Sequence, residues 1–269
     1  MTLGPVERVD VEGLTIAFER RGWGPPLVLA HGGMIDHREW AAQLDGLSDA
    51  FTVVAWDAPG CGASSDPPGS FRMPDYGRVL IGLIERLALD RPHLGGLSWG
   101  STLALEVVRQ RPDLPRSLVL TGAYAGWAGS LPPDEVEARL SGFLGDIERP
   151  PEVWMPAFLE TLLTDDAPET MRASLLATMA DASRPTGLRP MLQAMAEADL
   201  RGVLPTIGVP TLLLYGERDV RSSPEVAEEM QRSIPGSRLV LLSGAGHQSN
   251  VEFPVLFNDA VRSFLIGLT

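Results

Sequence analysis

The sequence predicts a single α/β domain, built on a parallel β-sheet and interrupted by a helical insertion. Short apolar runs alternate with longer segments of helical spacing in the first and last parts of the 269-residue chain. This alternation is typical of a parallel sheet with helices on both faces. It stops at residue 124 and resumes after residue 206, and the stretch between has helical patterning without a strand pattern. We therefore place the α/β core in residues 1–123 and 207–269, and a helical lid (cap) in residues 124–206.

The predicted strands are of two kinds. Residues 8–11 and 14–20 alternate between polar and apolar side chains and are joined tightly at Glu12-Gly13. The later strands are short apolar runs, which are typical of strands buried on both faces. They cover residues 26–30, 51–55, 94–97, 117–121, 211–215 and 238–242.

The predicted helices of the core lie between these strands. Residues 76–89 show the spacing most clearly, with apolar side chains recurring at three- and four-residue intervals from Val79 to Leu87. The other helices are predicted at residues 38–47, 101–110, 224–234 and 254–266.

Composition limits the classes of function. The formal net charge is −13 and no window holds a basic patch, so we expect neither nucleic acid nor an anionic membrane surface as a partner. The single cysteine, Cys61, excludes a disulfide framework and a multi-cysteine metal site. The first ten residues have no basic segment followed by an apolar stretch, so we expect no signal peptide and a cytoplasmic protein.

The stretch Gly96-Leu97-Ser98-Trp99-Gly100 is the central motif of the chain. It has the form G-x-S-x-G and stands between a predicted strand and a predicted helix. A serine at such a sharp turn has a strained backbone and a hydroxyl lifted clear of the sheet. We therefore predict Ser98 as a nucleophile.

A serine nucleophile needs a base and an orienting carboxylate. His247 follows the last predicted strand, at the same edge of the sheet as Ser98, and we predict it as the base. Glu217 and Asp219 both follow the strand at residues 211–215. We choose Asp219, because a glycine turn at Gly216 should direct its side chain to the sheet edge, whereas Glu217 should face water.

The oxyanion formed by attack of Ser98 needs backbone N–H donors. We predict the N–H of Trp99, at a helix N-terminus, and that of Gly33, with Met34 as the alternative. The glycines at 32 and 33 should let the loop turn an amide inward without steric cost. His31, in the same loop, is expected to be a hydrogen-bonded structural residue.

Other motifs have structural interpretations. Asp57 is expected to cap the amides of a turn, and Cys61 to be a packing residue. Residues 95–102 imitate a phosphate-binding loop, but Ser101 stands where that motif needs a lysine, which excludes a nucleotide site. No cluster resembles a metal site, so we expect neither a metal nor a cofactor.

The predicted lid is rich in large apolar side chains, some of which should face the cleft. We predict an apolar substrate pocket that includes Met34, Trp99, Trp127 and Trp154. Such a pocket favours a small-molecule substrate with a hydrophobic acyl or alcohol part.

Taken together, four separated elements resemble the α/β-hydrolase superfamily, and the resemblance covers essentially the whole chain. They are His31-Gly32-Gly33, the turn from Asp57 to Ser64, Gly96-x-Ser98-x-Gly100, and Gly216-x-x-Asp219 followed by Gly246-His247. The resemblance implies a mostly parallel eight-stranded sheet, a lid inserted after the sixth strand, and acyl-enzyme chemistry.

We therefore predict a serine hydrolase that cleaves a carboxylic ester or a lactone. Residues 98–105 are also similar to proline iminopeptidases, so an aminopeptidase is one alternative. However, Met34-Ile35 stands where that family has Pro-Gly, and Ala58-Pro59 stands where it has Gln-Arg. A perhydrolase, a C–C hydrolase or a cyclase on the same scaffold remains open, as does a ligand-sensing receptor, against which an intact Ser98, Asp219 and His247 set argues.

Overall fold

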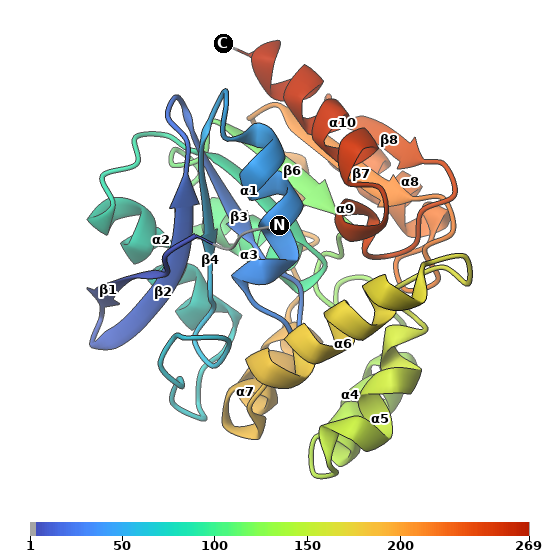
Figure 1. Ribbon diagram of the computed structural model, residues 1–269. Helices are drawn as coiled ribbons and strands as arrows, with labels where there is room; N and C mark the ends of the chain where they lie inside the picture. Colours follow the sequence, from blue (N-terminus) through green and yellow to red (C-terminus); the bar gives the residue numbers. More distant parts are fainter. Residues whose placement is uncertain (1–3, 269) are drawn as a thin grey trace.

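A computed structural model of the protein describes residues 4–268. Its centre is an eight-stranded sheet of order β1-β2-β4-β3-β5-β6-β7-β8 (Figure 1). The strands from β3 onward pair in parallel, as predicted, while β2 pairs antiparallel with both β1 and β4. The strands are β1 (Glu7–Val11), β2 (Leu14–Arg21), β3 (Pro26–Ala30), β4 (Thr52–Trp56), β5 (His93–Leu97), β6 (Ser117–Thr121), β7 (Thr211–Gly216) and β8 (Arg238–Leu242).

The two faces of the sheet bury alternate side chains of each strand. Leu27 and Leu29 of β3 belong to an apolar cluster beneath two helices, α1 (Ala41–Leu47) and α10 (Pro254–Ile266). Val28 and Ala30 point to the opposite face. That face is covered by α2 (Met73–Arg86), α3 (Trp99–Gln110) and α8 (Pro224–Ser233).

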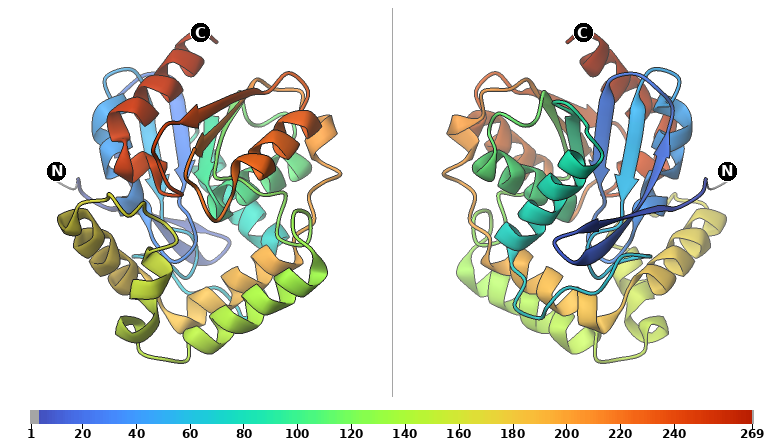
Figure 2. Two further views of the ribbon diagram at one scale, coloured as in Figure 1. Left: turned by 90° about the vertical axis from the view of Figure 1, so that its right-hand side faces the viewer. Right: turned by 90° about the vertical axis from the view of Figure 1, so that its left-hand side faces the viewer.

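A helical insert separates β6 from β7. Its helices are α4 (Pro133–Asp146), α5 (Pro151–Leu159), α6 (Glu169–Ala182) and α7 (Pro185–Glu197), followed by the short η2 (Leu204–Thr206). Figure 2 shows these helices lying across one end of the sheet. The insert confirms the predicted interruption of the α/β pattern. The boundaries of the insert at residues 124 and 206 stay predictions. The ends of the predicted core, residues 1–3 and 269, lie outside the described part of the chain.

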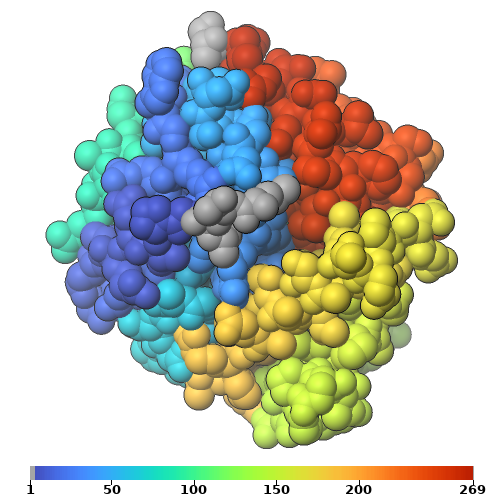
Figure 3. All heavy atoms as spheres, viewed as in Figure 1, coloured from blue at the N-terminus to red at the C-terminus, as the bar shows by residue number. Residues whose placement is uncertain are grey.

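The insert is attached tightly to the core where α6 passes into α7. The Arg184 guanidinium donates to the carbonyl oxygens of Gly62 and Ser64, at 2.7 and 2.8 Å. Next to it, the backbones of Gly60 and Gly187 touch so closely that neither position has room for a Cβ atom. In Figure 3 the yellow α6 lies directly against the blue N-terminal and red C-terminal parts of the chain.

Three elements differ from the sequence-based expectation. The helix predicted at residues 38–47 is a 3-10 turn, η1 (His37–Trp40), followed by α1. Helix α2 begins at Met73 because Asp75 accepts the backbone N–H of Arg72, and it ends early because Ala88 has a φ of +51°. A single-turn helix, α9 (Ser249–Glu252), was not predicted. None of the described helices is long and apolar enough to span a bilayer.

Candidate active site

Ser98 lies in the sharp turn between β5 and α3. Its φ of +52° and ψ of −110° put a residue with a side chain in a sparsely populated region, at a cost of about 1–3 kcal/mol. Two hydrogen bonds hold this conformation: the Ser98 N–H donates to Thr121 O at 2.8 Å, and the Thr102 N–H donates to Ser98 O at 3.1 Å. The turn therefore lifts the Ser98 side chain above the carboxyl end of β5.

The glycines on either side of Ser98 are required by close backbone contacts. A Cβ at Gly96 would overlap the carbonyl group of Gly100, and a Cβ at Gly100 would overlap the carbonyl oxygen of Ala30. The spacing of the G-x-S-x-G motif thus reflects the packing of α3 onto β5 and β3.

Asp219 and His247 form a buried hydrogen-bonded pair. The distance between His247 Nδ1 and Asp219 Oδ2 is 2.7 Å. The other carboxylate oxygen of Asp219 accepts the backbone N–H groups of Arg221 and Ser222, at 2.8 and 2.9 Å. Asp219 is thereby locked on three sides, and His247 Nε2 has no hydrogen-bond partner among the described residues. Because the Asp219 carboxylate accepts this hydrogen bond, Nδ1 is the donor, and a neutral imidazole in this tautomer has its lone pair at Nε2.

Two further glycines make room for this pair. A Cβ at Gly122, just past β6, would lie 2.9 Å from Cε1 of His247. A Cβ at Gly216 would overlap the carbonyl oxygens of Ala245 and Gly246. Gly216 is therefore needed because the loop after β8 approaches its backbone closely. The sequence suggested a glycine turn at this position, but Gly216 does not have a left-handed backbone conformation.

Ser98 and His247 line the same cavity, which lies between the carboxyl end of the sheet and the helical insert. The cavity holds about 560 Å³ of empty space, including its mouth. The Ser98 hydroxyl makes no hydrogen bond with His247 in this structure; such bonds are often long before substrate binds. The other lining residues are mostly apolar, and Arg221 and Gln248 are the polar exceptions. The apolar ones and the glycines are Gly32, Gly33, Met34, Leu97, Trp99, Trp127, Phe143, Phe158, Leu162, Leu188, Met191, Leu192 and Met195.

The loop after β3 brings candidate oxyanion donors to this cavity. Gly33, Met34 and Trp99 all line it, and the Trp99 N–H is the first of α3, where no preceding turn can accept it. The left-handed residue of the loop is Met34, with a φ of +67°, and neither Gly32 nor Gly33 adopts that conformation. The positive φ therefore falls at Met34, one residue after the two glycines at which the sequence suggested that the loop turns.

Residues 27–261 match the model of the alpha/beta hydrolase family. The chain belongs to this family. Among curated relatives, it is 27% identical to a pimeloyl-[acyl-carrier protein] methyl ester esterase of Nitrosomonas europaea, over 90% of this chain and 96% of that protein. It is 28% identical to 3-oxoadipate enol-lactonase 2 of Acinetobacter baylyi, over 90% of this chain and 88% of that protein.

The fold of this alpha/beta hydrolase is close to that of a solved esterase. The thermophilic esterase from Thermogutta terrifontis superposes with a TM-score of 0.90 at 29% identity, covering 98% of this chain and 99% of that one. Distant relatives of the chain are thus esterases and lactonases, and the relatives do not agree on one substrate.

A second layer of residues supports the loop after β3 in this hydrolase. His31 is fully buried: its Nε2 accepts the Ala58 N–H at 3.0 Å, and its Nδ1 then donates to Gly32 O at 2.6 Å. Burial lowers the pKa of His31, which keeps the ring neutral. Both ring nitrogens are occupied, as expected for a structural residue.

Glu39 is a buried carboxyl group behind the same loop. Its Oε2 accepts the Gly32 N–H at 2.8 Å, and its Oε1 accepts the Gln248 side-chain amide at 2.7 Å. Burial raises the pKa of Glu39 to about 7, although both hydrogen bonds oppose the rise. Glu39 thus joins the loop after β3 to the residue that follows His247.

We expect the stability of the wild type to fall relative to Glu39→Gln as the pH rises. The folded-state pKa of about 7 lies above the ordinary value of 4.5, so the folded state binds the Glu39 proton more tightly than the unfolded state does. This contribution to the free energy of unfolding is complete below pH 4.5 and is lost as the pH rises through 7. At ~1.4 kcal/mol per pKa unit, the relative change is about 3 kcal/mol. Urea denaturation of both proteins at pH 4 and pH 8 measures it; a difference that stays constant between the two pH values would contradict the assignment.

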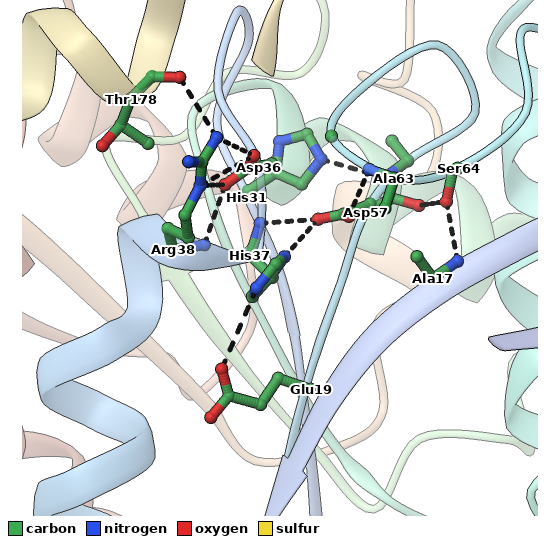
Figure 4. A network of polar contacts seen from close by, with 12 residues as sticks. Ala17, Glu19, His31, Asp36, His37, Arg38, Asp57, Ala63, Ser64 and Thr178 are labelled. Atoms are coloured by element: carbon green, nitrogen blue, oxygen red, sulfur yellow. Dashed lines mark hydrogen bonds and ion pairs between the residues drawn. The ribbon is translucent and has the colours of Figure 1, made fainter. Parts of the chain in front are cut away.

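A further polar network lies close to His31 (Figure 4). Asp57 accepts the backbone N–H and Nδ1 of His37 at 2.9 and 2.6 Å, and the Ala63 N–H at 2.9 Å. Asp57 thus caps a turn as expected, with His37 as an additional partner. Burial alone would lower the pKa of His37, but Asp57 and the nearby Asp36 and Glu19 raise it.

Asp36, His37 and Asp57 bring three possible metal-ligand atoms within 4.8 Å of one another, a grouping that the sequence did not reveal. Each of them already has a partner inside the protein. Asp36 is paired with Arg38 at 2.6 Å, which also pairs with Asp181 of α6 at 2.8 Å. The arrangement is that of an ion-pair network joining η1, the loop after β4 and the insert.

The structure places the remaining sequence candidates as follows. Glu217 is exposed and binds Ser243 Oγ at 2.8 Å, away from the cavity. Cys61 is buried, and burial raises the pKa of its thiol. Of the four predicted pocket residues, Met34, Trp99 and Trp127 line the cavity, whereas Trp154 packs against Phe158, with ring centroids 6.3 Å apart.

Several cavity residues were not singled out from the sequence. Arg221 follows Asp219 by two residues, and Gln248 follows His247 directly. Their positions beside the predicted acid and base were the available signal. The apolar residues of α7 that face the cavity, Leu188, Met191, Leu192 and Met195, have helical spacing that does not distinguish pocket lining from ordinary packing.

Proposed function

We propose that the protein is a serine hydrolase that cleaves a carboxylic ester or a lactone with a hydrophobic part through an acyl-enzyme. The observation that carries the proposal is the cavity shared by Ser98 and His247, in which the imidazole is held by Asp219 and its Nε2 is unoccupied. Nucleophile, base and orienting acid come from three different strand ends of one sheet.

In the proposed mechanism, Ser98 Oγ attacks the substrate carbonyl while His247 Nε2 takes its proton. The N–H groups of Trp99 and Gly33, with Met34 as the alternative to Gly33, stabilise the oxyanion. His247 then gives the proton to the leaving alcohol. A water molecule, deprotonated by the same imidazole, releases the acid and restores Ser98.

The apolar wall of the cavity and the relatives support an ester or lactone substrate. An esterase and an enol-lactonase are among the curated relatives that align with at least 90% of the chain. The cavity also argues against the aminopeptidase alternative. No acidic side chain is among its lining residues in the described structure to receive a protonated amine, and the one charged arginine there would repel it.

A substrate panel tests the proposal. We expect turnover of p-nitrophenyl esters of short and medium acyl chains or of lactones, and none of proline arylamides. Arylamide cleavage without ester cleavage would favour the aminopeptidase. Product formation that requires peroxide, or release of a carbon fragment, would favour the perhydrolase or the C–C hydrolase. Tight retention of a ligand with a single turnover would favour a receptor.

A further inference from the structure

Arg221 is a charged side chain in the wall of a mostly apolar cavity, whose other polar lining residues are Ser98, His247 and Gln248. Its guanidinium carbon lies 4.8 Å from the ring centroid of Phe158 and 5.8 Å from that of Phe143. Nη1 donates to Thr161 Oγ1 at 3.1 Å. The two rings and the hydroxyl hold the guanidinium in place, and the backbone N–H of the same residue is bonded to Asp219.

No carboxylate of the described chain forms an ion pair with this guanidinium. Arg218, three residues earlier in the same loop, is more exposed and pairs with Asp166 at 2.6 Å. The other arginines without an acidic partner in the described residues are all exposed to solvent: Arg8, Arg86, Arg91, Arg116 and Arg238. Among the described arginines without an acidic partner, Arg221 is therefore the only one that is half-buried and not exposed.

Two further polar side chains, Tyr124 and Arg139, lie near Arg221. Tyr124 Oη and Arg139 Nη1 are buried and, beyond their contact with each other, have no hydrogen-bond partner in the described part of the structure. Both residues lie near enough to Arg221 to act on its charge. Burial lowers the pKa of Arg221 and the Arg139 charge lowers it further, whereas Tyr124 and the carboxylate of Asp219 oppose the change. Because an arginine keeps its proton even then, the site holds a half-buried positive charge with no ion-pair partner in the described residues, since the nearby Asp219 carboxylate is hydrogen-bonded to His247.

We propose that Arg221 binds a carboxylate of the substrate while Ser98 attacks an ester or lactone carbonyl elsewhere in the same molecule. The substrate class is then a carboxylate-bearing ester or lactone with an apolar middle. This inference rests on the proposed function and narrows its substrate. A guanidinium binds a carboxylate through two parallel N–H bonds, and mostly apolar surroundings strengthen that interaction. The single guanidinium that lines the cavity matches a monoanion.

Methyl esters of matched length test the proposal. Monomethyl esters of C5 to C8 dicarboxylic acids are compared with methyl esters of monocarboxylic acids of equal length, for example monomethyl adipate with methyl hexanoate. We expect kcat/KM for the acid ester to be at least about 10-fold higher at the best length. Arg221→Met should reduce the ratio of the two kcat/KM values by about 10-fold or more, to about one or below, mainly through KM.

Arg218→Met is the matched control, because it removes a positive charge from the same loop outside the cavity. It should leave the ratio and the activity unchanged within about twofold, as expected for an exposed ion pair.

A carboxylate in the alcohol part of the substrate is tested with 4-acyloxybenzoates against neutral phenyl esters. Preference for the anion in either series supports the proposal. A ratio near one in both, or one that Arg221→Met does not change, overturns it.

Binding to Ser98→Ala by calorimetry separates this inference from the proposed function. If the wild type cleaves neutral esters and Ser98→Ala binds monomethyl adipate no better than methyl hexanoate, the function stands and the Arg221 site fails. If Ser98→Ala binds monomethyl adipate at least about 10-fold more tightly although the wild type cleaves neither ester, the Arg221 site stands and the hydrolase proposal fails. This readout does not depend on the folding of an Arg221 variant.

Discussion

Replacing Ser98 with alanine is expected to abolish ester turnover, with kcat lowered by about 10⁴-fold or more. The hydroxyl oxygen is the proposed attacking atom, and no other serine lines the cavity in the described structure. The substitution keeps the Cβ atom and the same backbone, so the fold should persist. The measurements are kcat on a p-nitrophenyl ester and covalent labelling with a fluorophosphonate. Labelling that persisted in Ser98→Ala would show that another residue is the nucleophile.

Ser98→Gly provides a second variant for the same prediction. It also removes the hydroxyl, and it relieves the strain of a side chain at a φ of +52°. We expect it to be as inactive as Ser98→Ala and more stable than that variant by about 1 kcal/mol in urea denaturation. Equal stability of the two variants would mean that the turn stores no strain at Ser98.

The fold could be predicted from the sequence because its strands carry two independent signals. The run at Pro26–Ala30 is apolar on both faces and ends at a glycine-rich turn, and the structure gives a strand with the same bounds. The motif around Ser98 could also be predicted, because its two glycines are required by packing. Backbone atoms occupy the space that a side chain at Gly96 or Gly100 would need. Local rules and tertiary packing agree at these positions.

The cavity could not be predicted in the same way. Arg221 becomes a cavity residue only because α4 and α5 bring Phe143 and Phe158 against a loop that follows β7, and no local pattern encodes that approach. Trp154 illustrates the converse, since its place in α5 resembled that of a pocket residue and its ring packs within the insert. The left-handed Met34 was also hidden, because a glycine was the better sequence candidate for that conformation.

Asp219→Asn is expected to lower kcat by about 10⁴-fold, by analogy with other Ser-His-Asp enzymes. Oδ1 of Asp219 accepts two backbone N–H groups, and an asparagine oxygen in that position would keep both bonds. The asparagine NH₂ group would then face His247 Nδ1. The imidazole would have to accept a hydrogen bond there and carry its proton on Nε2, so it could not take the proton of Ser98. Stopped-flow or steady-state ester hydrolysis gives the rate, and thermal unfolding should show little change.

Glu217→Gln is the matched control, because Glu217 lies in the same loop and differs from Asp219 in its surroundings. Its carboxylate is exposed and accepts from Ser243 Oγ and the Gly244 N–H, at 2.8 and 3.1 Å. These bonds lower the pKa of Glu217, and neither involves His247. The substitution should therefore change kcat by less than about twofold, as for other exposed polar contacts. If Glu217→Gln were inactive and Asp219→Asn active, the orienting acid would be Glu217, and the buried Asp219–His247 hydrogen bond would serve only to hold the loop after β8.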